Sequence, residues 1–157
     1  NRNWFAAVQT EKKMMFIILT LIIAVAAFNL VSTLVMTVTD KQADIAILRT
    51  MGASAGLVQR IFLVQGLAIG LLGSLSGVVF GLLIALNIDV IVPFIEALFR
   101  VQFLPRDIYF ISQLPSDVRF DDVLTVGVMA FVLSILATIY PSRRAAQVKP
   151  AEALRYE

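Results

Sequence analysis

The chain contains no cysteine and no histidine. Disulfide frameworks are therefore excluded, as are metal sites built from Cys or His ligands. Nucleophilic systems that pair a Ser or Cys with His are excluded for the same reason. We accordingly predict no metal site in this chain.

Charged residues are scarce. They make up 15% of the 157 residues, whereas 59% are hydrophobic. A soluble domain usually carries about 25% charged residues, so this chain has too few to coat a globule. The formal net charge of +2 gives no support for nucleic-acid binding. The composition predicts an integral membrane protein.

Three long runs carry no charged side chain: residues 14–39, 61–88 and 123–142. About 20 apolar residues suffice to cross a hydrocarbon core of about 30 Å as a helix. Buried helices of a soluble bundle would need polar faces, which these runs lack. Ion-coupled carriers normally need ionisable groups at membrane depth, so a secondary transporter is disfavoured.

These runs predict an all-α integral membrane fold with three transmembrane helices, a cytoplasmic helix between the first two and a periplasmic loop between the last two. By the positive-inside rule, the Lys and Arg residues of the first connector and the tail place both segments in the cytoplasm. Lys12 and Lys13, just before the first span, favour the opposite orientation. The expected segments are an interfacial helix at 1–13, spans at 14–39, 54–88 and 123–141, the cytoplasmic helix at 40–52, the periplasmic loop at 89–122 and the cytoplasmic tail at 142–157. Because the chain starts without Met or a signal-peptide pattern, we also expect further protein upstream.

Residues 40–52 read as a short amphipathic helix. Thr39 and Gln42 suggest a capping box, Gly52 suits the residue after the helix, and Ser54 can cap the next one. Its apolar arc contains an acid, Asp44, flanked by Ala43, Ile47, Leu48 and Met51. One interpretation places the helix in the lipid headgroups. The other, which better explains an acid in the arc, docks it on a protein that offers a pocket and a basic group.

The second span carries a glycine series that predicts close packing against another helix, since small residues let helix backbones approach in lipid. The alternative is a loosely packed span that tolerates glycine. The series consists of Gly66, Gly70, Gly73, Gly77 and Gly81.

Several stretches resemble the FtsX/MacB-like permease family. "DIAILRTMGAS" at 44–54 is similar to the family's cytoplasmic coupling helix, and "YPSRRAAQVKPAEALRYE" at 140–157 is similar to its tail, with a tyrosine-proline stop. "VAAFNLVSTLVM" at 25–36 and "DIYFISQLPSDV" at 107–118 resemble, more narrowly, the LolC/LolE permeases of lipoprotein-releasing complexes. The tail is closer to LolC and the 107–118 stretch to LolE, which leaves open a merged, homodimeric form.

The resemblance implies the last three helices of a four-helix permease whose large periplasmic domain follows its first helix. It implies no catalytic residue and no cofactor in this chain, since ATP and Mg²⁺ would be bound by a separate, LolD-like ABC ATPase. Other implied partners are a second permease, a lipoprotein and a periplasmic carrier, in the inner membrane of a Gram-negative bacterium. The residues expected to dock on the ATPase are Asp40, Lys41, Asp44, Ile45, Ile47, Leu48, Arg49 and Met51.

Under this resemblance, the acyl chains of a lipoprotein would lie against the outer half of the first span, where flexible Met side chains suit lipids of varied shape. The expected cavity residues are Met14, Met15, Ile18, Leu19 and Ile22. The alternative is that these side chains face bulk lipid or neighbouring helices. Alternative functions are an FtsX-like permease that controls a periplasmic cell-wall enzyme, a MacB-like efflux permease and a membrane scaffold unrelated to ABC transporters.

Overall fold

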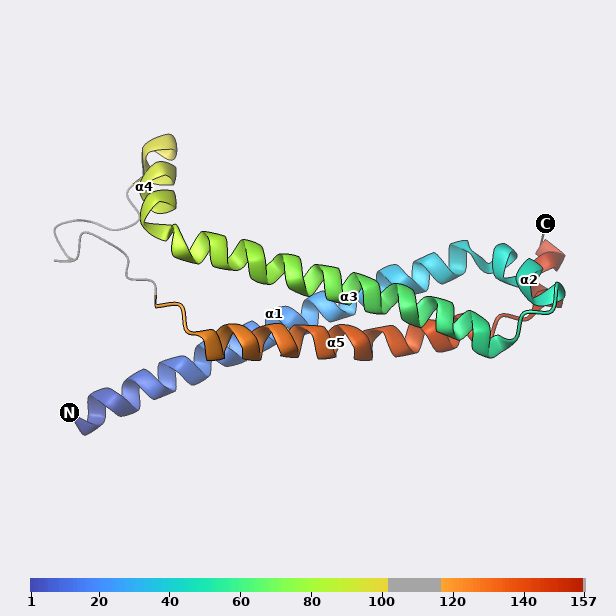
Figure 1. Ribbon diagram of the computed structural model, residues 1–157, viewed down its shortest axis with the longest axis horizontal. Coiled ribbons are helices and arrows are strands. Elements are labelled where there is room, and N and C mark those ends of the chain that lie inside the picture. The colour runs from blue at the N-terminus through green and yellow to red at the C-terminus, as the bar shows by residue number, and fades with distance from the viewer. Residues whose placement is uncertain (102–116, 157) are drawn as a thin grey trace. The chain divides into compact units, whose positions relative to one another are not determined.

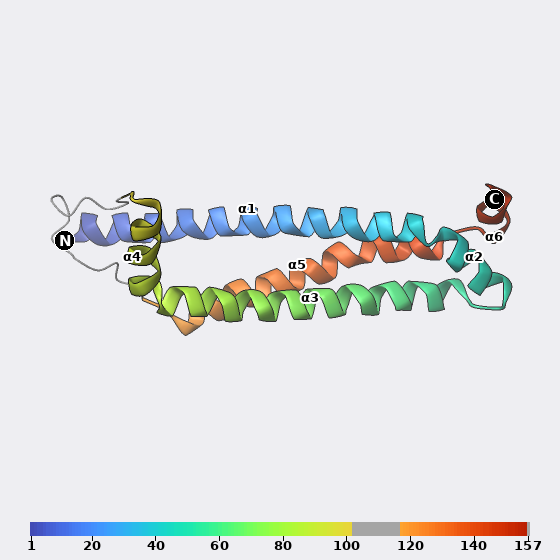
Figure 2. The same cartoon turned by 90° about the horizontal axis from the view of Figure 1, so that it is seen from above.

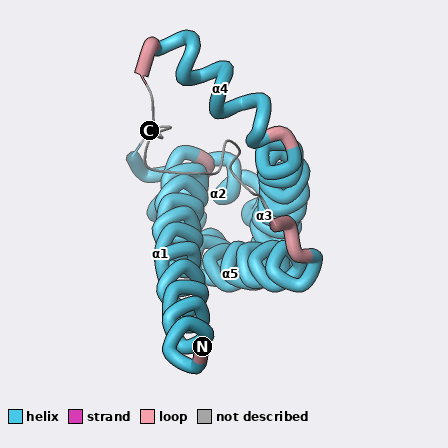
Figure 3. Tube along the Cα trace, turned by 90° about the vertical axis from the view of Figure 1, so that its left-hand side faces the viewer, coloured by secondary structure: helices cyan, strands magenta, loops and turns pink. Residues whose placement is uncertain are grey.

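The computed structural model describes residues 1–101 and 117–156, and every regular element in these ranges is a helix (Figure 3). The 107–118 stretch lies almost wholly outside the described residues. The elements are α1 (Arg2–Asp40), α2 (Gln42–Thr50), α3 (Ala55–Leu86), α4 (Ile88–Phe99), α5 (Phe120–Ala146), α6 (Pro150–Ala153) and the 3₁₀ turn η1 (Leu154–Tyr156).

Three of these helices, α1, α3 and α5, are long and apolar enough to cross a membrane (Figure 1). The predicted all-α membrane fold is therefore confirmed. The bounds differ in two places. The expected interfacial helix at 1–13 and the first span form one uninterrupted helix, α1. The connector expected as a loop at 89–122 begins with a helix, α4, which was not predicted from the sequence.

Several threonine side chains inside the first span form hydrogen bonds within their own helix. In α1, the Oγ1 atoms of Thr20, Thr33 and Thr37 each donate to the carbonyl oxygen four residues earlier, at 2.8–2.9 Å. A bilayer core offers no water to polar groups, so these internal bonds let threonine occupy an apolar span.

The third span continues through Pro141, so the expected tyrosine-proline stop is wrong as a helix end. Pro141 lies inside α5, and the helix runs on to Ala146. Proline removes one backbone donor, a loss that membrane helices tolerate where neighbouring groups re-satisfy the freed carbonyls. Ser142, the next residue, is fully buried, and its Oγ donates to the carbonyl oxygen of Ile139 at 2.8 Å.

The connection after α3 is set by its polar residues. Asn87 ends α3, and its Nδ2 donates to the Leu83 carbonyl oxygen at 2.8 Å, which satisfies one of the last carbonyls of that helix. α4 then starts at Ile88 and ends at Phe99, and the next residue, Arg100, adopts the left-handed conformation with φ of 52°. None of the described residues of α4 is buried.

The chain divides into two compact parts, residues 1–72 with 128–157, and residues 73–127. In the first part, burial is concentrated where α1, α2, α3 and α5 meet. The buried cluster there consists of Val38, Ile45, Val58, Phe62, Ala145 and Val148, with Ala153 packed against it. In the second part, no described residue is buried.

Candidate functional site

The short helix α2 follows α1 after a single non-helical residue. Lys41 has φ of −99° and ψ of 10°, and its N–H donates to the Thr37 carbonyl oxygen at 3.0 Å. The predicted Thr39–Gln42 capping box is therefore wrong. Thr39 still belongs to α1, where its Oγ1 donates to the Val35 carbonyl oxygen at 3.0 Å, so it is not available to cap α2.

The other end of α2 follows the predicted pattern. Gly52 has φ of +107°, the Ala53 N–H donates to Leu48 and the Gly52 N–H to Arg49, at 3.0 and 3.2 Å. These two bonds form a Schellman motif, in which glycine suits the left-handed position because it has no Cβ. Ser54 caps α3 as predicted, since its Oγ accepts from the Leu57 N–H at 3.1 Å. α2 is thus joined to α1 and α3 by short turns.

One side of α2 is buried inside the chain. Ile45 is 3% exposed and Ala46 is fully buried. Ile45 belongs to the cluster that also contains residues of α1, α3 and α5. It was expected among the docking residues, but its side chain lies in this internal cluster and is not part of the exposed surface of α2.

Arg49, in the last turn of α2, is half-buried and faces the C-terminal part of the chain. Its Nη1 donates to the carbonyl oxygens of Ala146, at 3.3 Å, and Val148, at 2.8 Å. Arg49 is among the predicted docking residues, and no sequence pattern indicates this contact. Its acceptors are backbone atoms 97 and 99 positions away, which no local pattern encodes.

The opposite side of α2 is apolar and exposed. The exposed fractions are 48% for Ile47, 44% for Leu48 and 79% for Met51. Asp44 is also exposed, and its Oδ2 lies 3.1 Å from Lys41 Nζ. The acid in the predicted arc therefore has a partner within its own helix turn. Ile47, Leu48 and Met51 form what we call the exposed arc of α2.

The glycine series divides into two groups. Gly66 and Gly70 are buried in α3 and face α5, where a Cβ at Gly66 would lie 2.7 Å from Thr138 Cβ and one at Gly70 would lie 3.0 Å from Ser134 Cβ. The hydroxyls of Thr138 and Ser134 donate to carbonyls of their own helix, at 2.7 Å. Close packing is thus found at the first two glycines. At Gly73, Gly77 and Gly81, a Cβ would meet nothing within 4 Å in the described chain.

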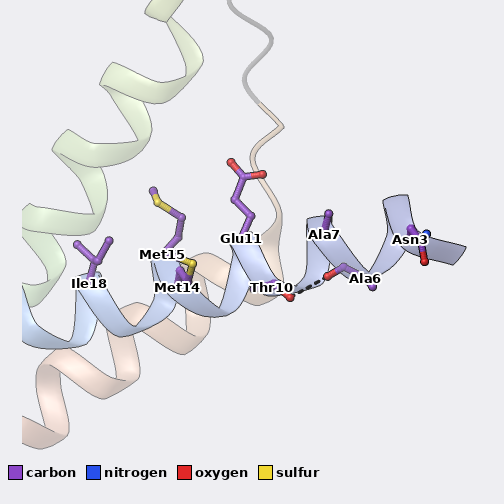
Figure 4. A pocket seen from close by; sticks show the side chains of 8 residues that line it. All are labelled: Asn3, Ala6, Ala7, Thr10, Glu11, Met14, Met15 and Ile18. Carbon is purple, nitrogen blue, oxygen red and sulfur yellow. Dashed lines mark hydrogen bonds between the residues drawn. The ribbon is translucent and has the colours of Figure 1, made fainter. Parts of the chain in front are cut away.

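A hollow of about 560 Å³ runs along the first turns of α1 (Figure 4). Among the described residues, all of its lining side chains come from α1, at the three- and four-residue spacing of one helix face. Three of the five expected cavity residues line it. The lining consists of Asn3, Ala6, Ala7, Thr10, Glu11, Met14, Met15 and Ile18. The other two expected residues, Leu19 and Ile22, lie outside this lining and are 39% and 60% exposed.

Comparison with known proteins gives a family. The sequence model of the FtsX-like permease C-terminal domain matches residues 16–150, which is most of the chain. The chain belongs to the FtsX-like permease family. The matched range runs from the first span of this family member to the start of α6, so it includes α2, Arg49 and both acceptors of Arg49.

Curated members of the family are similar to the whole chain. The lipoprotein-releasing system transmembrane protein LolC of Neisseria meningitidis is 58% identical over 157 residues, and LolC of Xylella fastidiosa is 53% identical over 157 residues. LolE of Haemophilus influenzae is 45% identical over 160 residues, covering 98% of the chain. The chain spans 38% of the length of each of these relatives.

Proposed function

We propose that this chain is the C-terminal membrane part of a permease subunit of an ABC transporter, which extracts lipoproteins from the inner membrane and passes them to a periplasmic carrier. The observation that carries the proposal is the 45–58% identity, over nearly the whole chain, to proteins named for a lipoprotein-releasing system. The chain contributes no bond chemistry. ATP and Mg²⁺ are bound by a separate ATPase.

The exposed arc of α2 is the proposed docking surface for that ATPase, with Asp40, Lys41 and Asp44 beside it. Single exposed apolar residues are ordinary, but Ile47 and Leu48 of α2 and Met51 directly after it lie on one side and form a small continuous surface. Amphipathic helices commonly bind a partner by laying such a surface into a groove. Under this proposal α2 and the C-terminal tail lie in the cytoplasm, as the distribution of cations favours.

A second permease subunit is the proposed partner within the membrane, as a homodimer or a heterodimer. Asn29 supports this pairing. It lies near the middle of the uncharged run in α1, it is exposed, and its side-chain amide makes no hydrogen bond to the residues that the structure describes. Lipid cannot satisfy an amide, whereas a polar group on a neighbouring helix can. The open faces of Gly73, Gly77 and Gly81 would also admit a helix from outside this chain.

The hollow on α1 supports the proposed acyl-chain surface. Met14, Met15 and Ile18 give it an apolar, adaptable wall, while Asn3, Thr10 and Glu11 give its other end polar groups. A lipoprotein anchor has the same division, because its acyl chains are apolar and its peptide is polar. Leu19 and Ile22 extend the apolar surface further along α1.

The decisive experiment uses the complete permease, reconstituted in vesicles with the ATPase and a lipoprotein. We expect ATP-dependent transfer of lipoprotein to the soluble carrier. Ile47→Glu should reduce copurification of the ATPase and abolish transfer, because it places a charge in the docking surface. ATPase-dependent activation of a cell-wall enzyme, or drug efflux, without lipoprotein transfer would contradict the proposal.

A further inference from the structure

Arg49 provides a cap for a helix other than its own. Ala146 is the last residue of α5, and its carbonyl is among the four that a helix leaves without an intrahelical partner. The Nη1 atom of Arg49 donates to this oxygen and, more closely, to that of Val148 in the following turn. A cation at a helix C-terminus is favourable because the carbonyl dipoles point toward it.

Apolar packing supports the same connection. Ala145, the residue before the capped carbonyl, is fully buried, and Val148 is 8% exposed. Both belong to the cluster that contains Ile45 of α2, and Ala153 of α6 packs against that cluster. Figures 1 and 2 both show α6 beside α2 at this end of the chain. The end of α5 and the residues after it thus enclose the inner side of α2.

α2 is consequently attached to all three spans of the chain. Its attachments to α1 and α3 are covalent and short, through Lys41 and through residues 51–54. Its attachment to α5 is not covalent, and depends on the Arg49 bonds and on the buried cluster. A force applied to the exposed arc reaches α1 and α3 through the backbone. It reaches the C-terminal end of α5 directly through this contact, and the middle of α5 through the packing of Thr138 and Ser134 on Gly66 and Gly70 of α3.

We propose that Arg49 is a positioning residue that makes α2 and the C-terminal end of α5 move as one body when an ATPase acts on α2. This inference rests on the proposed function. In this proposal, Arg49 transmits movement from α2 to α5 inside the permease, and the exposed arc contacts the ATPase. The two roles make different predictions, because a docking residue affects binding, whereas a transmission residue affects the yield of transport per ATP hydrolysed.

The first test uses spin labels on the complete permease in complex with its ATPase. This chain has no cysteine, so Thr50→Cys and Gln147→Cys, both at exposed positions, can be labelled selectively within it. Dipolar EPR should give one narrow distance distribution between α2 and the segment after α5, unchanged between the nucleotide-free and ATP-bound complexes. A distribution that shifts with ATP would overturn the proposal, and this measurement needs no variant of Arg49.

The second test compares Arg49→Gln with Arg49→Lys. We expect Arg49→Gln to copurify with the ATPase and to hydrolyse ATP, while lipoprotein release per ATP falls by about fivefold or more, in the usual range of coupling between sites. The EPR distribution should broaden. Arg49→Lys keeps a cation that can donate to the same carbonyls and should restore part of the release.

Lys149→Gln is the matched control. Lys149 is a cation in the same segment, but its Nζ is paired at 3.5 Å with Glu152 and its side chain is 73% exposed. Release should be unchanged in this variant. Full release with a narrow distribution in Arg49→Gln would overturn the proposal, as would loss of ATPase copurification in that variant. Failure of the unmodified complex to release lipoprotein would instead refute the proposed function.

Discussion

Gly66 of α3 and Thr138 of α5 lie in direct contact, and a Cβ at position 66 would come within 2.7 Å of Thr138 Cβ. Gly66→Ala should therefore force the two helices apart and lower the free energy of unfolding by about 1–3 kcal/mol, the usual cost of overpacking. Thermal unfolding in detergent measures this.

Gly77→Ala is the control for that prediction. Position 77 has nothing within 4 Å of a Cβ in the described chain, and alanine is the better helix former. The isolated protein should be unaffected or slightly more stable. Equal destabilisation by both substitutions would show that the Gly66–Thr138 contact is not specific.

Ile45 and Ile47, two positions apart in α2, should allow an effect on stability to be distinguished from an effect on ATPase docking. Ile45→Ala removes a side chain that is 3% exposed and should cost about 2–5 kcal/mol. Ile47 is 48% exposed, so Ile47→Ala should change stability by about 0.5 kcal/mol or less. ATPase copurification should fall in Ile47→Ala despite its normal unfolding. If only Ile45→Ala affects copurification, the exposed arc is not the docking surface.

The Lys41–Asp44 pair is exposed on both sides, at 60% and 64%, so it adds little to stability. Asp44→Lys should leave unfolding nearly unchanged. If a basic group of the ATPase approaches Asp44 on docking, the same substitution should weaken binding by about 2–5 kcal/mol. Asp44→Asn removes the charge without reversing it, so its binding free energy should lie between those of the unmodified protein and Asp44→Lys. Binding that is insensitive to both changes would place the ATPase elsewhere.

A photo-crosslinker at Met15 or Leu19 should capture a lipoprotein before ATP is added, and less of it after turnover. The two positions lie one helical turn apart and are 55% and 39% exposed. Val64 of α3, an apolar residue that is 64% exposed, provides a comparison position. Crosslinks only to phospholipid, or equal capture of lipoprotein at Val64, would show that this surface of α1 faces bulk lipid and does not bind the lipoprotein specifically.

Asn29→Leu should reduce pairing of two permeases by about 1–2 kcal/mol, the range found for hydrogen bonds between membrane helices. Crosslinking yield or energy transfer between labelled subunits in vesicles would report the change. Stability of the single subunit should not fall, because the amide bonds to nothing in the described chain. Ser32→Ala, one turn away on α1, is the control and should have a smaller effect on pairing. Unaltered pairing in Asn29→Leu would count against a contact of Asn29 with the second permease.

The three spans were predictable from the sequence because a run without charge has few alternatives to a membrane helix. Gly52 and Ser54 were predictable for a similar reason, since glycine and serine have strong local preferences at helix ends. Thr39 was misassigned because a threonine can cap the next helix or bond back to its own, and the sequence does not say which residue interrupts the helix. The predicted stop at Pro141 was wrong because a proline inside a membrane helix removes one hydrogen bond without necessarily ending the helix, and α5 continues to Ala146.

The contact of Arg49 could not be predicted, because its acceptors are backbone carbonyls whose position depends on how α5 folds back onto α2. Likewise, the glycine series correctly indicated close packing of α3, but it did not indicate which of the glycines contact another helix. Only the tertiary crossing with Ser134 and Thr138 distinguishes Gly66 and Gly70 from the three glycines that follow. Such information resides in pairs of residues far apart in the chain.

The continuity of α1 has a mechanical consequence. A helix of 39 residues is about 58 Å long, roughly twice the thickness of a hydrocarbon core. With its end held in the buried cluster around Val38, a straight helix of this length would act as a lever. A rotation of about 5° at that end would carry the far end, near Trp4, through about 5 Å at this helix length. A displacement too small to open a gap beside α2 would therefore be large enough, at the other end, to move an object the width of an acyl chain.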